Sequence, residues 1–266
     1  MNETPQTISC RCCIVGGGPA GMMLGFLLAR AGVDAIVLEK HADFLRDFRG
    51  DTIHPSTLEA MHEMGLLEDF LTLPHEKLQQ GEFKIGDVTI PMVDFSHLPV
   101  HAKFVALMPQ WDFLDFLAER AKRYPSFRLL MSAEVDGLIE EEGRVAGVAA
   151  KTKDGQLTIR ADLTIGADGR HSLLRREAGF EPLDIGAPMD VLWFKLSRRT
   201  TDSGALLGRV DAGHMLVVFN RGEYWQCAYV IAKGSADRLK AQGIGSLRGK
   251  IAGLAPFLAD RVAGLE

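Results

Sequence analysis

A glycine-rich turn near the N-terminus offers the clearest chemistry in this sequence. Residues 16–21 read GGGPAG, and they lie between an apolar run at residues 12–15 and a helix-like segment. In such a turn the first glycine permits a tight bend, the second lets the backbone approach a pyrophosphate, and the third lets helix and strand pack closely. The N–H groups at the start of the helix then face the negative charge. The pattern predicts a binding site for a nucleotide cofactor.

An acidic residue follows at the distance that such a site requires. Glu39 comes 18 residues after Gly21 and ends the apolar run at residues 33–38. A carboxylate at this position can accept both hydroxyls of an adenosine ribose, and it would repel a free 2′-phosphate. The turn and the acid together leave NAD and FAD open as the cofactor.

Three later pieces carry groups that suit the same cofactor. Arg49 precedes one predicted helix, Gln110 begins another, and residues 168–175 read DGRHSLLR. Asp168 and Gly169 follow a predicted strand, and ligands of open α/β sheets bind at the carboxyl ends of the strands. Gly169 lets the backbone come close to a ligand, while Asp168 offers an acceptor to a ribose hydroxyl or to a neighbouring N–H.

Local roles explain each of these residues as well. Arg49 would then form a surface ion pair, and Gln110 would simply start its helix. Ser172 would cap the helix that follows it, and Arg175 would pair with Glu177 or Asp162.

Taken in order, these pieces resemble the FAD-dependent monooxygenases of the aromatic hydroxylase family, which are similar to para-hydroxybenzoate hydroxylase. In that family the glycine turn binds the ADP half of FAD, and an Arg before the second helix contacts the flavin nucleotide. A DGxxSxxR segment touches FAD and is implicated in NAD(P)H binding. The resemblance covers essentially the whole chain, and it implies the following cofactor-binding residues: Gly16, Gly18, Pro19, Ala20, Gly21, Glu39, Lys40, Arg49, Gln110, Asp168 and Gly169.

The resemblance implies FAD as cofactor, NAD(P)H as co-substrate and O₂ as oxidant. Oxygen would reach an electron-rich, aromatic small molecule through a flavin C4a-hydroperoxide, chemistry that belongs to the cofactor. Two alternatives stay open: an FAD-dependent reductase of the same fold, and a non-catalytic nucleotide-binding remnant. No catalytic residue is assigned. Aromatic residues of the C-terminal half are candidates to line a substrate pocket, and strand alternation turns about half of them to one side: Trp193, Phe194, Phe219, Tyr224 and Trp225.

The elements that must position these groups indicate an α/β protein. We expect a Rossmann-like FAD-binding domain with a parallel sheet and an inserted β-meander, and a β-sheet-rich substrate domain. The FAD-binding domain is predicted over residues 1–75 and 101–180, and the substrate domain over 76–100 and 181–266. Within the first, buried helix positions are predicted at Phe113, Leu114, Leu117, Ala118 and Ala121. The meander is predicted from strands at 135–140, 144–152 and 156–159, followed by a separate strand at 161–166.

One departure from the family concerns the C-terminal part. Members of the resembled family carry a further Gly-Asp motif after the second sheet region, and nothing after Ile231 matches it. We therefore expect a C-terminally truncated or degenerate member of the family, with an incomplete flavin site.

Composition excludes several classes of function. With 30 basic and 35 acidic residues the formal charge is −5, so no global field attracts nucleic acid. No segment is apolar enough to span a membrane, and a cytoplasmic location is expected; the oligomeric state is not predicted. The cysteine cluster at residues 10–13 lacks metal-like spacing, so we expect buried residues of a central strand and no metal site. Alternation would put Cys10 and Cys12 on one face and Cys13 on the other.

Overall fold

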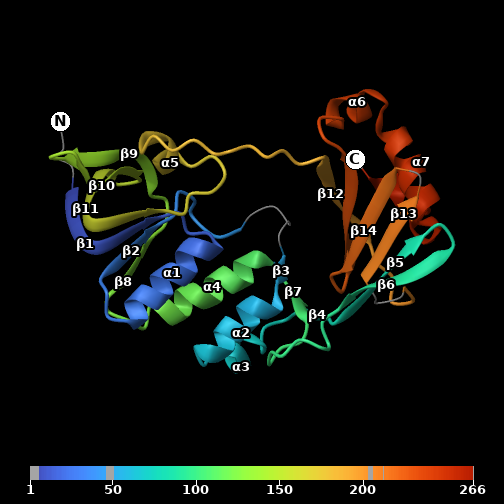
Figure 1. Ribbon diagram of the computed structural model, residues 1–266, viewed down its shortest axis with the longest axis horizontal. Helices are drawn as coiled ribbons and strands as arrows, with labels where there is room; N and C mark the ends of the chain where they lie inside the picture. The colour runs from blue at the N-terminus through green and yellow to red at the C-terminus, as the bar shows by residue number, and fades with distance from the viewer. Residues whose placement is uncertain (1–5, 46–50, 203–205, 212, 266) are drawn as a thin grey trace. The chain divides into compact units, whose positions relative to one another are not determined.

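The computed structural model describes residues 6–45, 51–202, 206–211 and 213–265 (Figure 1). The chain divides into two compact units, each made of two separate stretches. The first unit is Met1–Asp47 with Gln110–Leu183, and the second is Phe48–Pro109 with Asp184–Glu266. Residues 51–75 and 101–109 thus pack with the second unit, although they are predicted as part of the FAD-binding domain. The division into functional domains stays a prediction.

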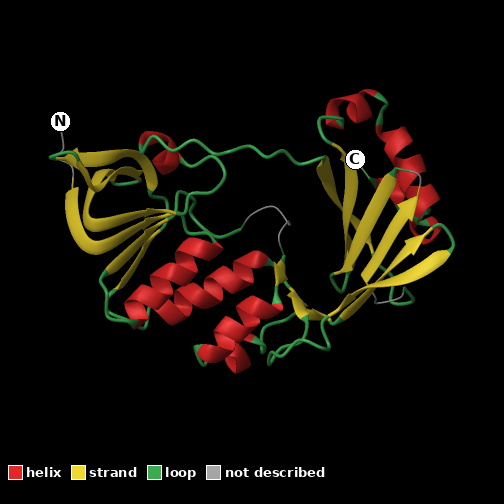
Figure 2. Cartoon of the chain, viewed as in Figure 1, coloured by secondary structure: helices red, strands yellow, loops and turns green. Residues whose placement is uncertain are grey.

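The first unit is built on a six-stranded sheet of order β8-β2-β1-β11-β10-β9 (Figure 2). Strands β8, β2, β1 and β11 run parallel, and β9, β10 and β11 form an antiparallel meander. The predicted α/β architecture, with a parallel sheet and an attached meander, is confirmed. The strands are β1 (Gln6–Val15), β2 (Ala35–Leu38), β8 (Phe127–Leu130), β9 (Glu134–Glu141), β10 (Arg144–Thr152) and β11 (Gly155–Gly166).

Two helices, α1 (Pro19–Arg30) and α4 (Gln110–Ala121), pack against each other beside this sheet, and a short helix α5 (Leu173–Glu177) follows β11 (Figure 1). Pro19 opens α1, where its missing N–H costs nothing. Gly25 lets α1 approach β2, because a Cβ there would lie 2.5 Å from Val37 Cγ2. The five residues of α4 that periodicity predicts as buried are its buried residues.

The end of the meander differs from the prediction. The strands expected at 156–159 and 161–166 form one continuous strand, β11. Its first half pairs with β10, and the strand continues along β1 to Gly166. No turn residue separates the two halves, so one strand joins the meander to the parallel sheet.

The cysteines of β1 are buried as predicted, and in the described part of the chain all four cysteines are free thiols. The expected alternation is wrong, however. The N–H groups of Arg11 and Cys12 both donate to the Asp34 carbonyl, at 3.1 and 3.0 Å, so the strand is irregular at this point, although β1 and β11 keep the same register on both sides of it. Cys10 and Cys13 lie in the same apolar cluster.

The second unit contains a six-stranded sheet of order β12-β15-β14-β13-β5-β6 and a three-stranded sheet of order β3-β7-β4. All neighbours are antiparallel except β13 and β5. The strands are β3 (Thr52–Ile53), β4 (Glu76–Leu78), β5 (Gln80–Ile85), β6 (Val88–Asp94), β7 (Val105–Leu107), β12 (Met189–Ser197), β13 (Leu206–Asp211), β14 (His214–Asn220) and β15 (Tyr224–Ala232). The helices are α2 (Pro55–Glu63), α3 (Leu67–Phe70), α6 (Ala236–Ala241), α7 (Ile244–Leu254) and the 3-10 turns η1 (Pro256–Leu258) and η2 (Val262–Gly264).

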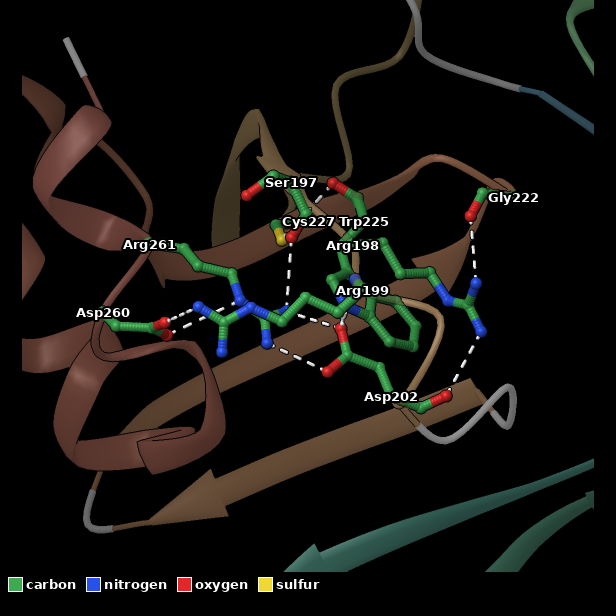
Figure 3. A network of polar contacts seen from close by, with 9 residues as sticks. All are labelled: Ser197, Arg198, Arg199, Asp202, Gly222, Trp225, Cys227, Asp260 and Arg261. Carbon is green, nitrogen blue, oxygen red and sulfur yellow. Dashed lines mark hydrogen bonds and ion pairs between the residues drawn. The ribbon is translucent and has the colours of Figure 1, made fainter.

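One face of the six-stranded sheet packs against α7, η1 and η2. Phe194, Trp225 and Tyr229 from the sheet form one apolar cluster with Ile251 and Leu258. A buried ion pair lies beside this core. Arg261 donates hydrogen bonds to both carboxylate oxygens of Asp202, at 2.5 and 2.9 Å (Figure 3). The Trp225 ring nitrogen donates to the same carboxylate at 3.0 Å.

Candidate functional site

The glycine turn has the geometry that the sequence predicts. Gly16 lies in the left-handed region at φ +113°, and a Cβ there would lie 2.3 Å from the Ala167 carbonyl oxygen. A Cβ at Gly21 would lie 1.9 Å from the Gly16 carbonyl oxygen, so only glycine lets α1 come this close to the turn. Gly18 is the N-cap of α1 and has open space around it. The start of α1 is thus accessible to an anion.

Glu39 is buried next to this turn. Its Oε2 accepts the Gly17 N–H at 3.0 Å. Its Oε1 accepts the backbone N–H of His41 at 3.0 Å and lies 2.5 Å from Nδ1 of the same residue. A Cβ at Gly17 would come within 2.8 Å of the Glu39 side chain. The carboxylate is therefore held in one position beside the helix N-terminus.

The Asp168 carboxylate accepts hydrogen bonds from neighbouring groups of its own segment, which is one of the two roles that the sequence leaves open for it. Its carboxylate accepts the Ser172 hydroxyl at 2.6 Å and the N–H groups of Leu173 and Leu174 at 2.7 and 3.3 Å. These bonds fix the DG turn to the start of α5. Beside Asp168, Gly169 has φ +84° and open space around it, which leaves its backbone accessible.

The rest of this segment also acts locally. Ser172 caps α5, because its hydroxyl accepts the Arg175 N–H at 2.9 Å. The Arg175 guanidinium donates to the Arg170 carbonyl at 2.8 Å. The carboxylates expected to pair with Arg175 have other contacts: Glu177 accepts the Leu138 N–H, and Asp162 pairs with Arg11.

A cavity of about 640 Å³ lies at the carboxyl ends of β1, β2 and β11, entirely within the first unit. It brings together six of the predicted residues: Gly16, Gly18, Glu39, Lys40, Asp168 and Gly169. Pro19, Ala20 and Gly21 lie in the first turn of α1, and Gln110 begins α4, so these four do not line the cavity. Arg49 lies outside the described residues.

Several lining residues were not predicted from the sequence. They reach the cavity from β9, β10 and α5 and from the loops next to Glu39 and Asp168, and the polar ones are His41, Glu134, Asp136, Lys151, His171 and Arg176. Lys151 is paired with Asp136 at 3.3 Å. The positions of the residues on β9 and β10 depend on the order of the strands in the sheet, which no local sequence motif predicts. His41 and His171 could have been found only from their closeness in sequence to Glu39 and to the DG segment.

The cavity fits the adenosine and pyrophosphate of a dinucleotide. Its volume lies within the range of small-molecule sites, about 300–1,000 Å³. Gly18 leaves room for phosphate oxygens at a helix N-terminus, and Lys40 and Arg176 add positive charge to a lining that also holds the carboxylates of Glu134 and Asp136. Glu39 supplies a buried acceptor for hydroxyl groups.

The candidate substrate residues separate onto the two faces of the large sheet. Trp193 and Phe219 stack with ring centroids 6.3 Å apart and planes at 24°. Tyr224 lies on this same face, because it follows the alternation of β15 and packs under Lys195. Burial raises the pKa of the Tyr224 hydroxyl. Phe194 and Trp225 belong to the opposite face, in the core under α7.

The described ranges hold neither a cluster of metal ligands nor a helix suited to a bilayer. Within them no three His, Cys, Asp or Glu side chains lie close enough together to hold a metal ion. No helix within them is both long and apolar enough to cross a membrane.

Comparison with known protein families and with curated proteins gives a family match and several named relatives. The family described as FAD binding domain matches residues 9–236. A 6-methylpretetramide 4-monooxygenase from Streptomyces rimosus is 29% identical over 252 residues, which are 94% of this chain and 60% of that protein. A 3-(3-hydroxy-phenyl)propionate/3-hydroxycinnamic acid hydroxylase from Shigella sonnei is 32% identical over 61% of this chain and 29% of its own length. The chain therefore spans less than two thirds of these relatives.

Solved structures share the fold. The p-nitrophenol 4-monooxygenase PnpA from Pseudomonas putida superposes with a TM-score of 0.79 at 20% identity. The match covers 94% of this chain and 63% of that one.

Proposed function

Because the chain belongs to the FAD binding domain family, and relatives in it are named monooxygenases and hydroxylases, we propose that this protein binds FAD and hydroxylates an aromatic small molecule with NAD(P)H and O₂. The observation that carries the proposal is the cavity in which the glycine turn, Glu39 and the DG turn meet. The cytoplasmic location and the predicted functional domains belong to the same proposal.

Each part of the cavity has a role in holding the cofactor. The N-terminus of α1 at Gly18 would face the pyrophosphate, and Glu39 would accept the ribose hydroxyls. Lys40 adds positive charge next to Glu39, and the backbone at Gly169 approaches the cofactor. Pro19, Ala20 and Gly21 support this turn from α1, and contacts of Arg49 and Gln110 with FAD remain part of the proposal.

When bound in this cavity, FAD would supply the redox chemistry that connects NAD(P)H with O₂. The overall reaction consumes one aromatic C–H, O₂, NAD(P)H and a proton, and it yields the phenol, water and NAD(P)⁺. A cluster of basic side chains next to the DG turn could bind the negatively charged phosphates of the nicotinamide nucleotide. His171, Arg175 and Arg176 line another cavity, of about 340 Å³, formed by α5 and the residues that flank it.

The test is spectroscopic and kinetic. The purified protein should carry flavin absorbance bands, and an aromatic compound should stimulate NAD(P)H oxidation. A folded protein that neither retains nor takes up FAD would favour the nucleotide-binding remnant over an enzyme. Labelled O₂ separates a hydroxylase from an FAD-dependent reductase, since only the hydroxylase places one labelled oxygen atom in the product.

A further inference from the structure

A cavity of the second unit lies between the end of β15, the start of β14 and the helices α6 and α7. Its volume is about 360 Å³, within the range of small-molecule sites, about 300–1,000 Å³. All its lining residues belong to the second unit, and none of them is among the candidate cofactor or substrate residues. We call it the α6 cavity.

The charged groups that line the α6 cavity are all basic. Arg238 on α6 and Lys250 on α7 bring two cations to it, and none of the described residues that line it is acidic. The cofactor cavity of the first unit differs, because the carboxylates of Glu39, Glu134 and Asp136 also line it. In a chain with a formal charge of −5, a cavity lined by cations alone is suited to an anion.

Neither cation has a counter-charge within the described ranges. Arg238 makes no ion pair and no side-chain hydrogen bond there. Lys250 donates to a neutral group, the side-chain oxygen of Gln242, at 3.3 Å. By contrast, Lys233, which follows β15, is paired with Asp190 at 2.7 Å. The two cations of the α6 cavity are therefore available to an anionic ligand.

The rest of the lining is apolar where it meets the core of this unit. Tyr229 is 1% exposed, and Ile231 and Leu239 pack against the same core cluster. The Tyr229 hydroxyl and His214 Nδ1 are hydrogen-bonded at 2.6 Å, which fixes both rings beside the cavity. These residues offer a ligand an apolar surface to cover, next to the two cations.

This combination favours a carboxylate over a free phosphate. The guanidinium of Arg238 matches the two oxygens of a carboxylate with two parallel hydrogen bonds. Free phosphate is polar on every side, so it would lose hydration against Ile231 and Leu239 and gain nothing from them. An organic acid can place its charge at Arg238 and Lys250 and its apolar body on the apolar lining.

We propose that the α6 cavity binds a small organic acid, whose carboxylate is held by Arg238 and Lys250 and whose apolar body lies against Tyr229, Ile231 and Leu239. The second unit alone forms this site, so binding requires neither FAD nor the substrate of the hydroxylation. The inference is thus independent of the proposed function.

The experiment titrates the purified protein with 4-fluorobenzoate and follows binding by fluorine NMR. We expect a dissociation constant below about 1 mM. The uncharged 4-fluorobenzyl alcohol should bind at least about tenfold more weakly, because it lacks the carboxylate. Inorganic phosphate at equal concentration should not displace the benzoate. Arg238→Gln and Lys250→Gln should each weaken benzoate binding at least about fivefold, because each removes a charged donor.

Lys240→Gln is the matched control. Lys240 lies exposed on the same helix, carries the same charge as Arg238 and does not line the cavity, so benzoate affinity should change less than about twofold. Arg238→Lys keeps the charge without the two-armed guanidinium, and its affinity should lie between wild type and Arg238→Gln. Arg238 is exposed and unpaired within the described ranges, so these variants should fold, which urea denaturation checks.

Three outcomes would overturn the inference: no saturable binding of 4-fluorobenzoate, equal affinity for the alcohol or for phosphate, or an unchanged benzoate affinity in Arg238→Gln. The last result would place the benzoate elsewhere on the chain. FAD retention is recorded in parallel and should be equal in all variants, because none of the changed residues lines the cofactor cavity. A protein that fails to take up FAD but binds benzoate through Arg238 would refute the proposed function and leave this site standing.

Discussion

Glu39 and Gly17 are joined by a hydrogen bond of 3.0 Å, from the backbone N–H of the turn to the carboxylate that follows β2. The bond ties the acid to the glycine turn within the first unit. Since His41 holds the other carboxylate oxygen, Glu39 is positioned before any ligand arrives. A pre-positioned acceptor loses little entropy when a ribose binds.

Replacing Glu39 by Gln should weaken FAD binding by about tenfold to a hundredfold. The change removes a charged acceptor, and hydrogen bonds to charged groups contribute about 1.5–3 kcal/mol. Fluorescence titration of the apoprotein with FAD measures the effect. Glu140→Gln, an exposed change on β9, serves as the control. Equal FAD affinity in wild type and Glu39→Gln would remove Glu39 from the site.

Gly18→Ala should weaken FAD binding and leave the stability of the fold nearly unchanged. The added methyl meets no atom within 4 Å, so the free energy of unfolding should change by less than about 1 kcal/mol. The same methyl stands where the pyrophosphate approaches, and FAD affinity should fall more than tenfold.

Gly16→Ala is the contrasting variant. Its methyl would clash with the Ala167 carbonyl at a φ of +113°, so it should lower the unfolding free energy itself. Urea denaturation and FAD titration of both variants make the test. Normal FAD binding by a folded Gly18→Ala protein would contradict the assignment of the turn.

Local patterns allowed the turn, Glu39 and the buried side of α4 to be predicted, because each depends on spacing within a few residues. The helix period alone identifies Phe113 and Leu117 as buried. Lys151 and Arg176 could not be found in this way. They reach the cavity only because β10 and α5 are placed by the sheet order, which depends on contacts between distant segments. The irregularity of β1 at Arg11 has no signature in the sequence.

The buried pair of Asp51 and Arg221 should be essential for the second unit. Their side chains are 2% and 5% exposed, and Arg221 also donates to the Asp51 carbonyl at 2.7 Å. Asp51→Asn would leave the guanidinium in a buried place without its counter-charge, at a cost of about 3–5 kcal/mol. Urea denaturation measures the loss. The double variant Asp51→Asn/Arg221→Met should recover part of it, and strict additivity of the two single changes would contradict a direct interaction.

Asp202 should make the free energy of unfolding depend on pH in the acid range. Hydrogen bonds from Arg261 hold the pKa of the Asp202 carboxyl far below its ordinary value, and further bonds from the Arg199 N–H and Trp225 act in the same direction. Because the folded pKa is depressed, the ion pair contributes fully above the unfolded pKa of about 3.9, and the contribution is lost as pH falls toward the folded pKa. Unfolding free energy measured from pH 7 to pH 3 should therefore fall below about pH 4. Asp202→Asn should be less stable at pH 7, by about 2 kcal/mol, and should lose less on acidification. Glu181→Gln, at an exposed position, provides the control. If Asp202→Asn kept the full acid sensitivity of the wild type, the pair with Arg261 would not be its source.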